Sequence, residues 1–163
     1  MGDPDALARG TLLHHLLERF PVLDGRGRAA LAAALAVPEP LMEAVQAVLG
    51  DPALGWLFGP GTLAEVGFSV PWNGQVLAGS IDRLVVADDV VTVIDYKSNA
   101  VVPATPQAVP EGYLRQLGAY AQAMAALYPG RRVEVAILWT ATAQLMRLDP
   151  DIVSTALVRA ATA

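Results

Sequence analysis

The segment Val90–Ser98 reads Val-Val-Thr-Val-Ile-Asp-Tyr-Lys-Ser, and its pattern decides the fold. Its β-branched residues favour a strand, in which successive side chains point to opposite faces. Asp95 and Lys97 therefore lie on one face and Tyr96 lies on the other. Charged groups at the end of an apolar strand are costly to bury unless they are paired or bind a metal. We expect the chemistry of the protein at this charged end.

A second strand-like run, Leu77–Val86, precedes this segment, and Asp88-Asp89 separates the two as a tight turn. A two-residue loop at that turn would place Asp82 directly opposite Asp95. Facing side chains have Cβ atoms about 4.5–5.5 Å apart, and like charges at that separation repel. Two carboxylates in this arrangement indicate a divalent cation between them.

Asn73-Gly74 is the strongest short hairpin signal in the sequence. A two-residue turn there would place Glu65 opposite Asp82. Glu65, Asp82 and Asp95 would then follow one another across one face of a three-stranded meander. A bulge at Gly79 would break this register, so Glu65 is an additional candidate that depends on it.

The composition indicates a single domain in a reducing, cytoplasmic setting. The chain of 163 residues is long enough to bury a substantial core, and its lack of cysteine excludes disulfides and thiolate metal sites. Its mean hydropathy of +0.42 comes from dispersed Ala, Leu and Val. No run approaches the roughly 18 consecutive apolar residues of a membrane helix. The N-terminus lacks the pattern of a secretory signal.

The net charge of −5 argues against an autonomous nucleic-acid binder, which would carry a basic patch. Any nucleic acid would have to be held by a metal ion, by a few local cations or by another protein domain. The abrupt start, in which residues 1–4 lead almost directly into a helix, indicates a domain excised from a larger chain. We expect residues 1–60 to be its helical N-terminal part and residues 61–163 its core.

Apolar periodicity and breaking residues predict the remaining elements. Helices are expected at Ala6–Phe20, Asp24–Val37, Leu41–Leu49 and Glu111–Tyr128, with a last one opened by Asp149-Pro150. Two further strands are expected at Val133–Thr140 and Gln144–Leu148. Together with the meander, this order predicts an α/β fold, with a mixed β-sheet of about five strands flanked by helices and an N-terminal helical region.

Several polar side chains cannot be assigned from periodicity. His14 and His15 flank the apolar arc of the first helix on opposite sides, and a packed or surface histidine is the more common role for either. On the long helix, Gln116 and Tyr120 share a face at i, i+4. Taken alone, Tyr120 would belong to the core and Gln116 to the surface.

Four segments of the chain, in this order, resemble the motifs of the RecB/AddA-like branch of the PD-(D/E)xK nuclease superfamily. They are Gly10–His14 (GTLLH), Gly79–Leu84 (GSIDRL), Ile94–Ser98 (IDYKS) and Gln116–Tyr120 (QLGAY). Each is weak alone, but together they are specific and span most of the chain. The resemblance implies a restriction-endonuclease-like fold, similar to the C-terminal nuclease domain of AddA-type helicase–nuclease subunits.

The resemblance also implies a function. The chain would be a metal-dependent, exonuclease-like DNA nuclease acting in double-strand break repair and recombination within an AddAB/RecBCD-like helicase–nuclease. Helicase modules of the parent protein would use ATP and deliver a single DNA strand, and an AddB-like subunit would be the partner. Delegating strand capture in this way would account for the acidic charge. No membrane association is expected.

Mg²⁺ is the expected cofactor, because it prefers oxygen ligands and keeps several waters, which suits a site of few carboxylates. We assign Asp82 and Asp95 as direct ligands, with the backbone carbonyl of Tyr96 as a third. The resemblance selects His14 over His15 as a further ligand. A nitrogen ligand would make Mn²⁺ a good substitute.

The remaining candidates would act on water or on the DNA. Lys97 would orient or deprotonate the attacking water, or stabilise the transition state, and these roles stay open. The resemblance brings Gln116 and Tyr120 into the site, where they would position the metal-bound water or the DNA backbone. Arg83 and Arg115 are candidate phosphate contacts, with ordinary surface charge as the alternative.

Two other interpretations remain for the chain as a whole. A catalytically inactive nuclease-fold module would only bind DNA or a partner subunit, although loss of activity usually removes such a charged cluster first. A structural α/β domain would use its carboxylates only as ion pairs with Lys97 and Arg83. Such a domain would not be stabilised by divalent ions.

Overall fold

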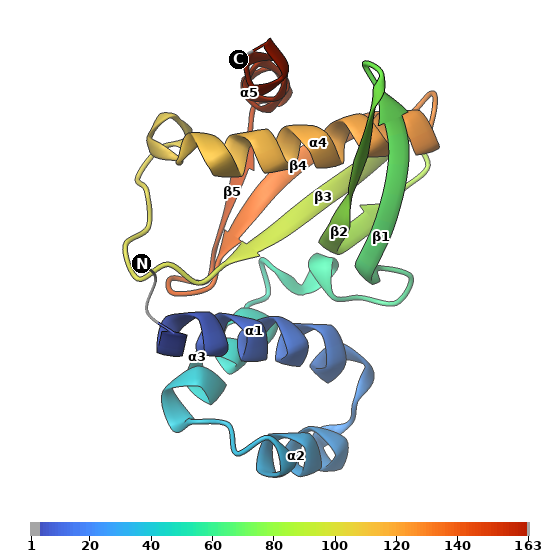
Figure 1. Cartoon of the computed structure of the whole chain (residues 1–163). Coiled ribbons are helices and arrows are strands. Elements are labelled where there is room, and N and C mark those ends of the chain that lie inside the picture. Colours follow the sequence, from blue (N-terminus) through green and yellow to red (C-terminus); the bar gives the residue numbers. More distant parts are fainter. Residues whose placement is uncertain (1–3, 163) are drawn as a thin grey trace.

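The computed structural model describes residues 4–162, in which helices cover both faces of one β-sheet (Figure 1). The α-helices are α1 (Pro4–Arg19), α2 (Gly25–Ala34), α3 (Glu39–Leu49), α4 (Glu111–Leu127) and α5 (Pro150–Thr162). The strands are β1 (Leu63–Trp72), β2 (Gln75–Val86), β3 (Val90–Lys97), β4 (Arg132–Trp139) and β5 (Gln144–Leu148).

The sheet is mixed, as the sequence predicts. Its strand order is β1-β2-β3-β4-β5, and every neighbouring pair is antiparallel except β3 and β4, which are parallel. A parallel pair needs a long crossover, and α4 supplies it. The prediction of a five-stranded mixed sheet flanked by helices, with a helical N-terminal region, is confirmed.

The hairpin of β2 and β3 has the predicted register. Arg83 faces Ile94 and Val86 faces Val91, and the amide of Ala87 donates to the carbonyl of Val90 at 2.9 Å. The ladder ends at the Arg83–Ile94 pair, one position before the two aspartates. Beyond that point the two strands separate, and polar side chains lie between them.

The hairpin of β1 and β2 also turns where expected, with Trp72 facing Gln75. Gly79 pairs with Phe68 in the same register, so there is no bulge at this glycine. The ladder is interrupted at Glu65 instead, whose φ of 52° is in the left-handed region. Glu65 is therefore not paired with Asp82, the residue that the predicted register places opposite it.

The two faces of β3 belong to two separate hydrophobic clusters. Val91 and Val93 pack with residues of α4 and α5, whereas Ile94 and Tyr96 pack with α1 and α3. Figure 1 shows the N-terminal helices on one side of the sheet and α4 on the other. Because β3 is packed on both faces, its carboxyl end lies between α1 and α4.

The helix boundaries differ from the prediction mainly at the second helix. Asp24 caps it as expected, since its carboxylate accepts from the amide of Gly27 at 2.8 Å. The helix ends at Ala34 rather than Val37, because Ala36 takes a left-handed conformation with φ of 50°. No helix within residues 4–162 is long and apolar enough to cross a membrane.

Close packing of α4 against α5 makes Gly118 sensitive to substitution. A Cβ there would collide with the carbonyl oxygen of Val153 and lie 3.0 Å from the Cβ of Leu157. Gly118→Ala should destabilise the protein by about 1–3 kcal/mol in urea unfolding, because backbone cannot give way like a side chain. Gly112→Ala in the same helix is the control, since its nearest neighbour would be Nη2 of Arg115 at 3.6 Å. Equal stability of the two variants would contradict the close packing.

Candidate active site

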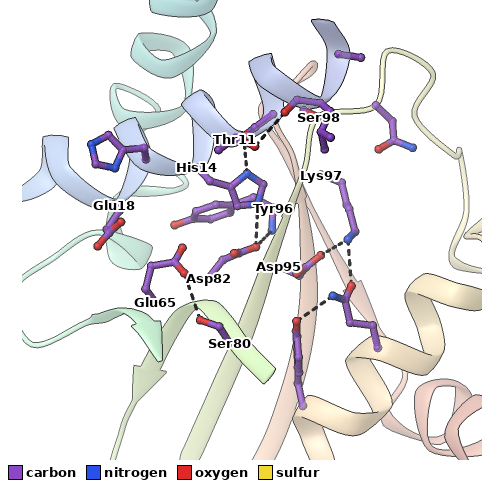
Figure 2. Close-up of a pocket in the computed structure, with 17 residues that line it drawn as sticks. Thr11, His14, Glu18, Glu65, Ser80, Asp82, Asp95, Tyr96, Lys97 and Ser98 are labelled. Atoms are coloured by element: carbon purple, nitrogen blue, oxygen red, sulfur yellow. Dashed lines mark hydrogen bonds and ion pairs between the residues drawn. The ribbon is translucent and has the colours of Figure 1, made fainter. Parts of the chain in front are cut away.

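A pocket of about 610 Å³ opens between α1, α4 and the ends of β2 and β3 (Figure 2). It gathers most of the predicted site residues, although they come from distant parts of the chain. Those lining it are His14, Glu65, Asp82, Asp95, Tyr96, Lys97, Gln116 and Tyr120. Arg83 and Arg115 are not among the lining residues.

Asp82 is held by a backbone amide of the neighbouring strand. The amide of Tyr96 donates to Oδ2 of Asp82 at 2.7 Å, which is possible because the β2–β3 ladder has already ended. Along a strand the backbone groups of successive residues point alternately to the two sides. The carbonyl of Lys97 points to β4, where it accepts from the amide of Thr140 at 3.0 Å. The carbonyl of Tyr96 therefore faces the side of Asp82.

His14 lies against Asp82 from the opposite helix. Its Nδ1 is 2.8 Å from the carbonyl oxygen of Gly10, and its Nε2 is 3.3 Å from Oδ2 of Asp82. The hydrogen bond to Asp82 raises the pKa of His14 to about 9, against the opposing effect of burial. The metal-free site therefore holds an imidazolium at neutral pH. His15 lines the same pocket, but His14 is the one that reaches Asp82.

Asp95 is a buried carboxylate with an incomplete set of partners. Nζ of Lys97 lies 2.9 Å from its Oδ2, and this ammonium is the one partner of that buried oxygen among the described residues. Burial, followed by the charge of Asp82, raises the pKa of Asp95 to about 6, and Lys97 lowers it. A buried carboxylate whose oxygen is compensated by a single ammonium can also act as a ligand for a cation.

A polar chain connects Lys97 to α4. The ammonium of Lys97 donates to Oε1 of Gln116 at 3.1 Å, and Nε2 of Gln116 donates to the hydroxyl of Tyr120 at 2.9 Å. Burial raises the pKa of Tyr120 to about 12, so its hydroxyl stays protonated. Phe68 packs edge-on against the Tyr120 ring, with centroids 5.5 Å apart. Lys97, Gln116 and Tyr120 thus form one hydrogen-bonded wall of the pocket, with Phe68 packed behind it.

Glu65 contributes a further carboxylate despite its irregular backbone. The hydroxyl of Ser80 donates to its Oε2 at 3.2 Å, and burial together with Asp82 raises its pKa. Glu18, which was not predicted as a site residue, lines the pocket beside it (Figure 2). The acidic groups thus extend beyond the two central aspartates.

The position of Arg83 corrects the prediction that it contacts phosphate. It faces Ile94 in the ladder and so points toward the N-terminal helices. Its guanidinium is buried, donates to the Tyr96 hydroxyl at 3.1 Å and to the Leu17 carbonyl at 2.8 Å, and covers the ring of Phe58. Arg83 therefore joins the sheet to α1 and is not available to a strand of DNA.

Arg115 lies on the exposed surface of α4, next to Gln116 but outside the pocket lining. Ordinary surface charge, the alternative given by the sequence, fits this position. Two other residues of the site were missed: Tyr113, whose ring lies against the ammonium of Lys97, and Asn99, which lines the pocket and is hydrogen-bonded to Tyr113. Tyr113 stands three residues before Gln116 on the same helix, which is a usable signal, whereas nothing in the sequence singles out Asn99.

The donor set suits a hard divalent cation, although it is not preassembled. Within residues 4–162, no three His, Asp or Glu side chains already converge as metal ligands. The protonated His14 supplies a positive charge beside Asp82. The carboxylates of Asp82 and Asp95 and the carbonyl of Tyr96 form a group of oxygen ligands typical of Mg²⁺ sites.

Comparison with known proteins agrees with this arrangement. The sequence model of the PD-(D/E)XK nuclease superfamily matches residues 2–161. The crystal structure of a protein of Eubacterium rectale assigned as an exonuclease superposes with a TM-score of 0.61 at 12% identity. The alignment covers 98% of this chain and 64% of that one, so the chain spans less than two thirds of that structure. This likeness shows the shared restriction-endonuclease-like fold.

A second solved structure, SSO0001, aligns with 91% of this chain and 72% of its own length. Its identity of 15% and TM-score of 0.40 are too low to support an argument. None of the curated proteins compared with the chain matches it.

The raised pKa of His14 predicts how the stability of the metal-free protein varies with pH. Since the folded pKa of about 9 exceeds the reference value of 6.5, the His14–Asp82 pair stabilises fully below pH 6.5 and its contribution is lost as the pH rises through about 9. In urea unfolding, His14→Gln should lose about 1–2 kcal/mol at pH 6 and much less at pH 10. His15→Gln is the control. A loss that stays constant between these pH values would contradict the assignment.

Proposed function

Since the chain belongs to the PD-(D/E)XK nuclease superfamily, we propose that it is a divalent-metal-dependent nuclease that hydrolyses phosphodiester bonds of DNA. The observation that carries the proposal is the meeting of Asp82, Asp95 and Lys97 at the separated ends of β2 and β3, in one pocket with Gln116 and Tyr120. Two carboxylates brought together in a partly buried pocket repel each other, which raises the pKa of Asp95 and favours a bound cation.

Asp82, Asp95 and the carbonyl of Tyr96 would hold Mg²⁺, with Mn²⁺ as a substitute. The bound ion would supply an activated water and neutralise phosphate charge. His14 would release its proton and become a further ligand, because its Nε2 already points at Asp82. The Tyr96 amide fixes the rotamer of Asp82 through the 2.7 Å hydrogen bond, so this ligand is oriented before any ion arrives.

Lys97 would face the scissile phosphate from the Asp95 side. Its ammonium is already directed into the pocket by Asp95 and by Oε1 of Gln116, so it would orient the attacking water and stabilise the charge that develops on the phosphate. Tyr120 keeps its proton and orients the Gln116 amide. Together, Gln116 and Tyr120 would position the water or the DNA backbone.

At a finer level, we propose an exonuclease-like enzyme that receives a single DNA strand from helicase modules of a parent protein. Its place would be an AddAB/RecBCD-like machine of double-strand break repair in the cytoplasm, with an AddB-like partner subunit and ATP consumed by the parent protein. Among the residues that line the pocket, Lys97 is the single Lys or Arg, which supports delegated capture of the strand. The exonuclease assignment of the Eubacterium rectale protein supports the same direction.

We further propose that residues 1–163 act as one nuclease domain rather than as a nuclease core with a detachable helical part. His14 of α1 reaches Asp82 of β2, and Leu13, Leu16 and Leu17 share a buried cluster with Tyr96 of β3. Removing residues 1–60 would therefore expose one face of the sheet and remove one side of the pocket.

Cleavage of single-stranded DNA tests the proposed activity. With Mg²⁺ or Mn²⁺, Asp95→Asn and Lys97→Ala should each lower kcat/KM by about 10²-fold or more, because each removes a group at the reacting centre. The matched control is Asp88→Asn in the exposed turn between β2 and β3, which should cut like the unaltered protein. Equal rates in all four proteins would contradict the assignment of Asp95 and Lys97 to the active site. DNA binding without cleavage by the unaltered protein would favour the inactive module.

Divalent-ion stabilisation tests the ligand set without requiring turnover. At an Mg²⁺ or Mn²⁺ concentration about 100-fold above Kd, binding to the folded state alone contributes about 2.7 kcal/mol and should raise Tm by roughly 5–10 °C. Asp82→Asn should abolish this rise, and Asp88→Asn should keep it. A Tm unaffected by either ion would show that the carboxylates serve only as structural ion pairs.

A further inference from the structure

Lys97 is the only lysine of the chain, and its ammonium has a neighbour that the motifs do not account for. Besides Asp95 and Gln116, Nζ lies 4.3 Å from the centroid of the Tyr113 ring. This is within the range in which the face of an aromatic ring attracts a cation. Tyr113 belongs to the first turn of α4 and does not line the pocket itself.

The Tyr113 ring is held in place at two points. The ring of Trp139 lies 6.4 Å away at a tilt of 44°, and Trp139 is fully buried and directly beside Lys97 in the β3–β4 ladder. The hydroxyl of Tyr113 is hydrogen-bonded to the side-chain amide of Asn99, with Nδ2 3.0 Å from Oη. Asn99 follows Lys97 by two residues, so the hydrogen bond also fastens the start of the loop that leaves β3.

We propose that Tyr113 is a positioning residue that keeps the ammonium of Lys97 at the reacting centre, and that Asn99 fixes the Tyr113 ring for this task. The inference rests on the proposed nuclease function and adds two residues to it. Lysine has a flexible four-carbon stem, so an ammonium with only polar partners would exchange among several rotamers. The ring adds an apolar contact 4.3 Å from Nζ to the two polar partners, and three partners restrict the ammonium more than two.

Cleavage kinetics of three tyrosine variants test the role in turnover. Tyr113→Leu removes the ring and should lower kcat about 10-fold, with KM within about twofold, because Tyr113 does not line the pocket. Tyr113→Phe keeps the ring and should retain kcat to within about threefold. Tyr128→Leu is the matched control, since it removes a ring that covers Arg131 at the far end of the same helix. It should leave kcat unchanged.

A spectroscopic measurement tests the geometry without any turnover. In protein labelled with ¹³C-lysine, the single lysine gives one set of Hε signals, which the face of the Tyr113 ring should shift upfield. Tyr113→Leu should return this shift to the value of a free lysine, whereas Tyr113→Phe and Asn99→Ala, which both keep the ring and remove its hydrogen bond at Oη, should reduce the shift only partly. Thermal melts of each variant verify folding, and Tyr113→Phe and Asn99→Ala keep the test decisive if Tyr113→Leu does not fold.

The outcomes separate the two levels of the proposal. An Hε shift that is unchanged in Tyr113→Leu, or a loss of kcat that Tyr128→Leu shares, would overturn the positioning role. Equal losses of kcat in Tyr113→Phe and Tyr113→Leu would also overturn it, because the hydroxyl rather than the ring would then matter. An unaltered protein that cleaves no DNA would overturn the nuclease function, and the lysine signal would still decide whether Tyr113 holds Lys97.

Discussion

The hydrogen bond from the Tyr96 amide to Asp82 joins β2 and β3 at the point where their ladder has ended. It lets the two strands separate without leaving a buried amide unpaired, which would be costly. The opening it creates holds the carboxylates, and the same bond sets the orientation of Asp82. The opening of the pocket therefore depends on the Tyr96 amide, which donates to the Asp82 side chain and not to a backbone carbonyl of β2.

Placing Asp82, Asp95 and Glu65 in one partly buried pocket creates a surplus of negative charge. His14 pairs with Asp82 and Lys97 pairs with Asp95, and both pairs compensate this charge. The hydrogen bond to Asp82 raises the pKa of His14, whereas burial and the charge of Asp82 raise the pKa of Asp95. A divalent cation would relieve the same repulsion. The ion pairs and a cation thus offer two ways to compensate the same carboxylates.

Local patterns determined much of this arrangement. The turns at residues 73–74 and 88–89 set the register of the meander, so the spacing of Asp82 and Asp95 could be derived by counting. Alternation along β3 correctly put Asp95 and Lys97 on one face and Tyr96 on the other. The i, i+4 spacing on α4 likewise placed Gln116 and Tyr120 together. Strand and helix periods are local properties, which a sequence displays directly.

Contacts between distant elements were decided only by the tertiary structure. Periodicity could not choose between His14 and His15, because the choice depends on how α1 crosses the ends of β2 and β3. Arg83 has the charge of a phosphate contact but is buried against α1, and Tyr113 both packs against the core and lies over the ammonium of Lys97. The sequence by itself thus determined the fold class, the register and the central carboxylates, since each follows from spacing along one chain segment. The packing of helices across the sheet determined which charges meet, because that depends on side chains far apart in sequence.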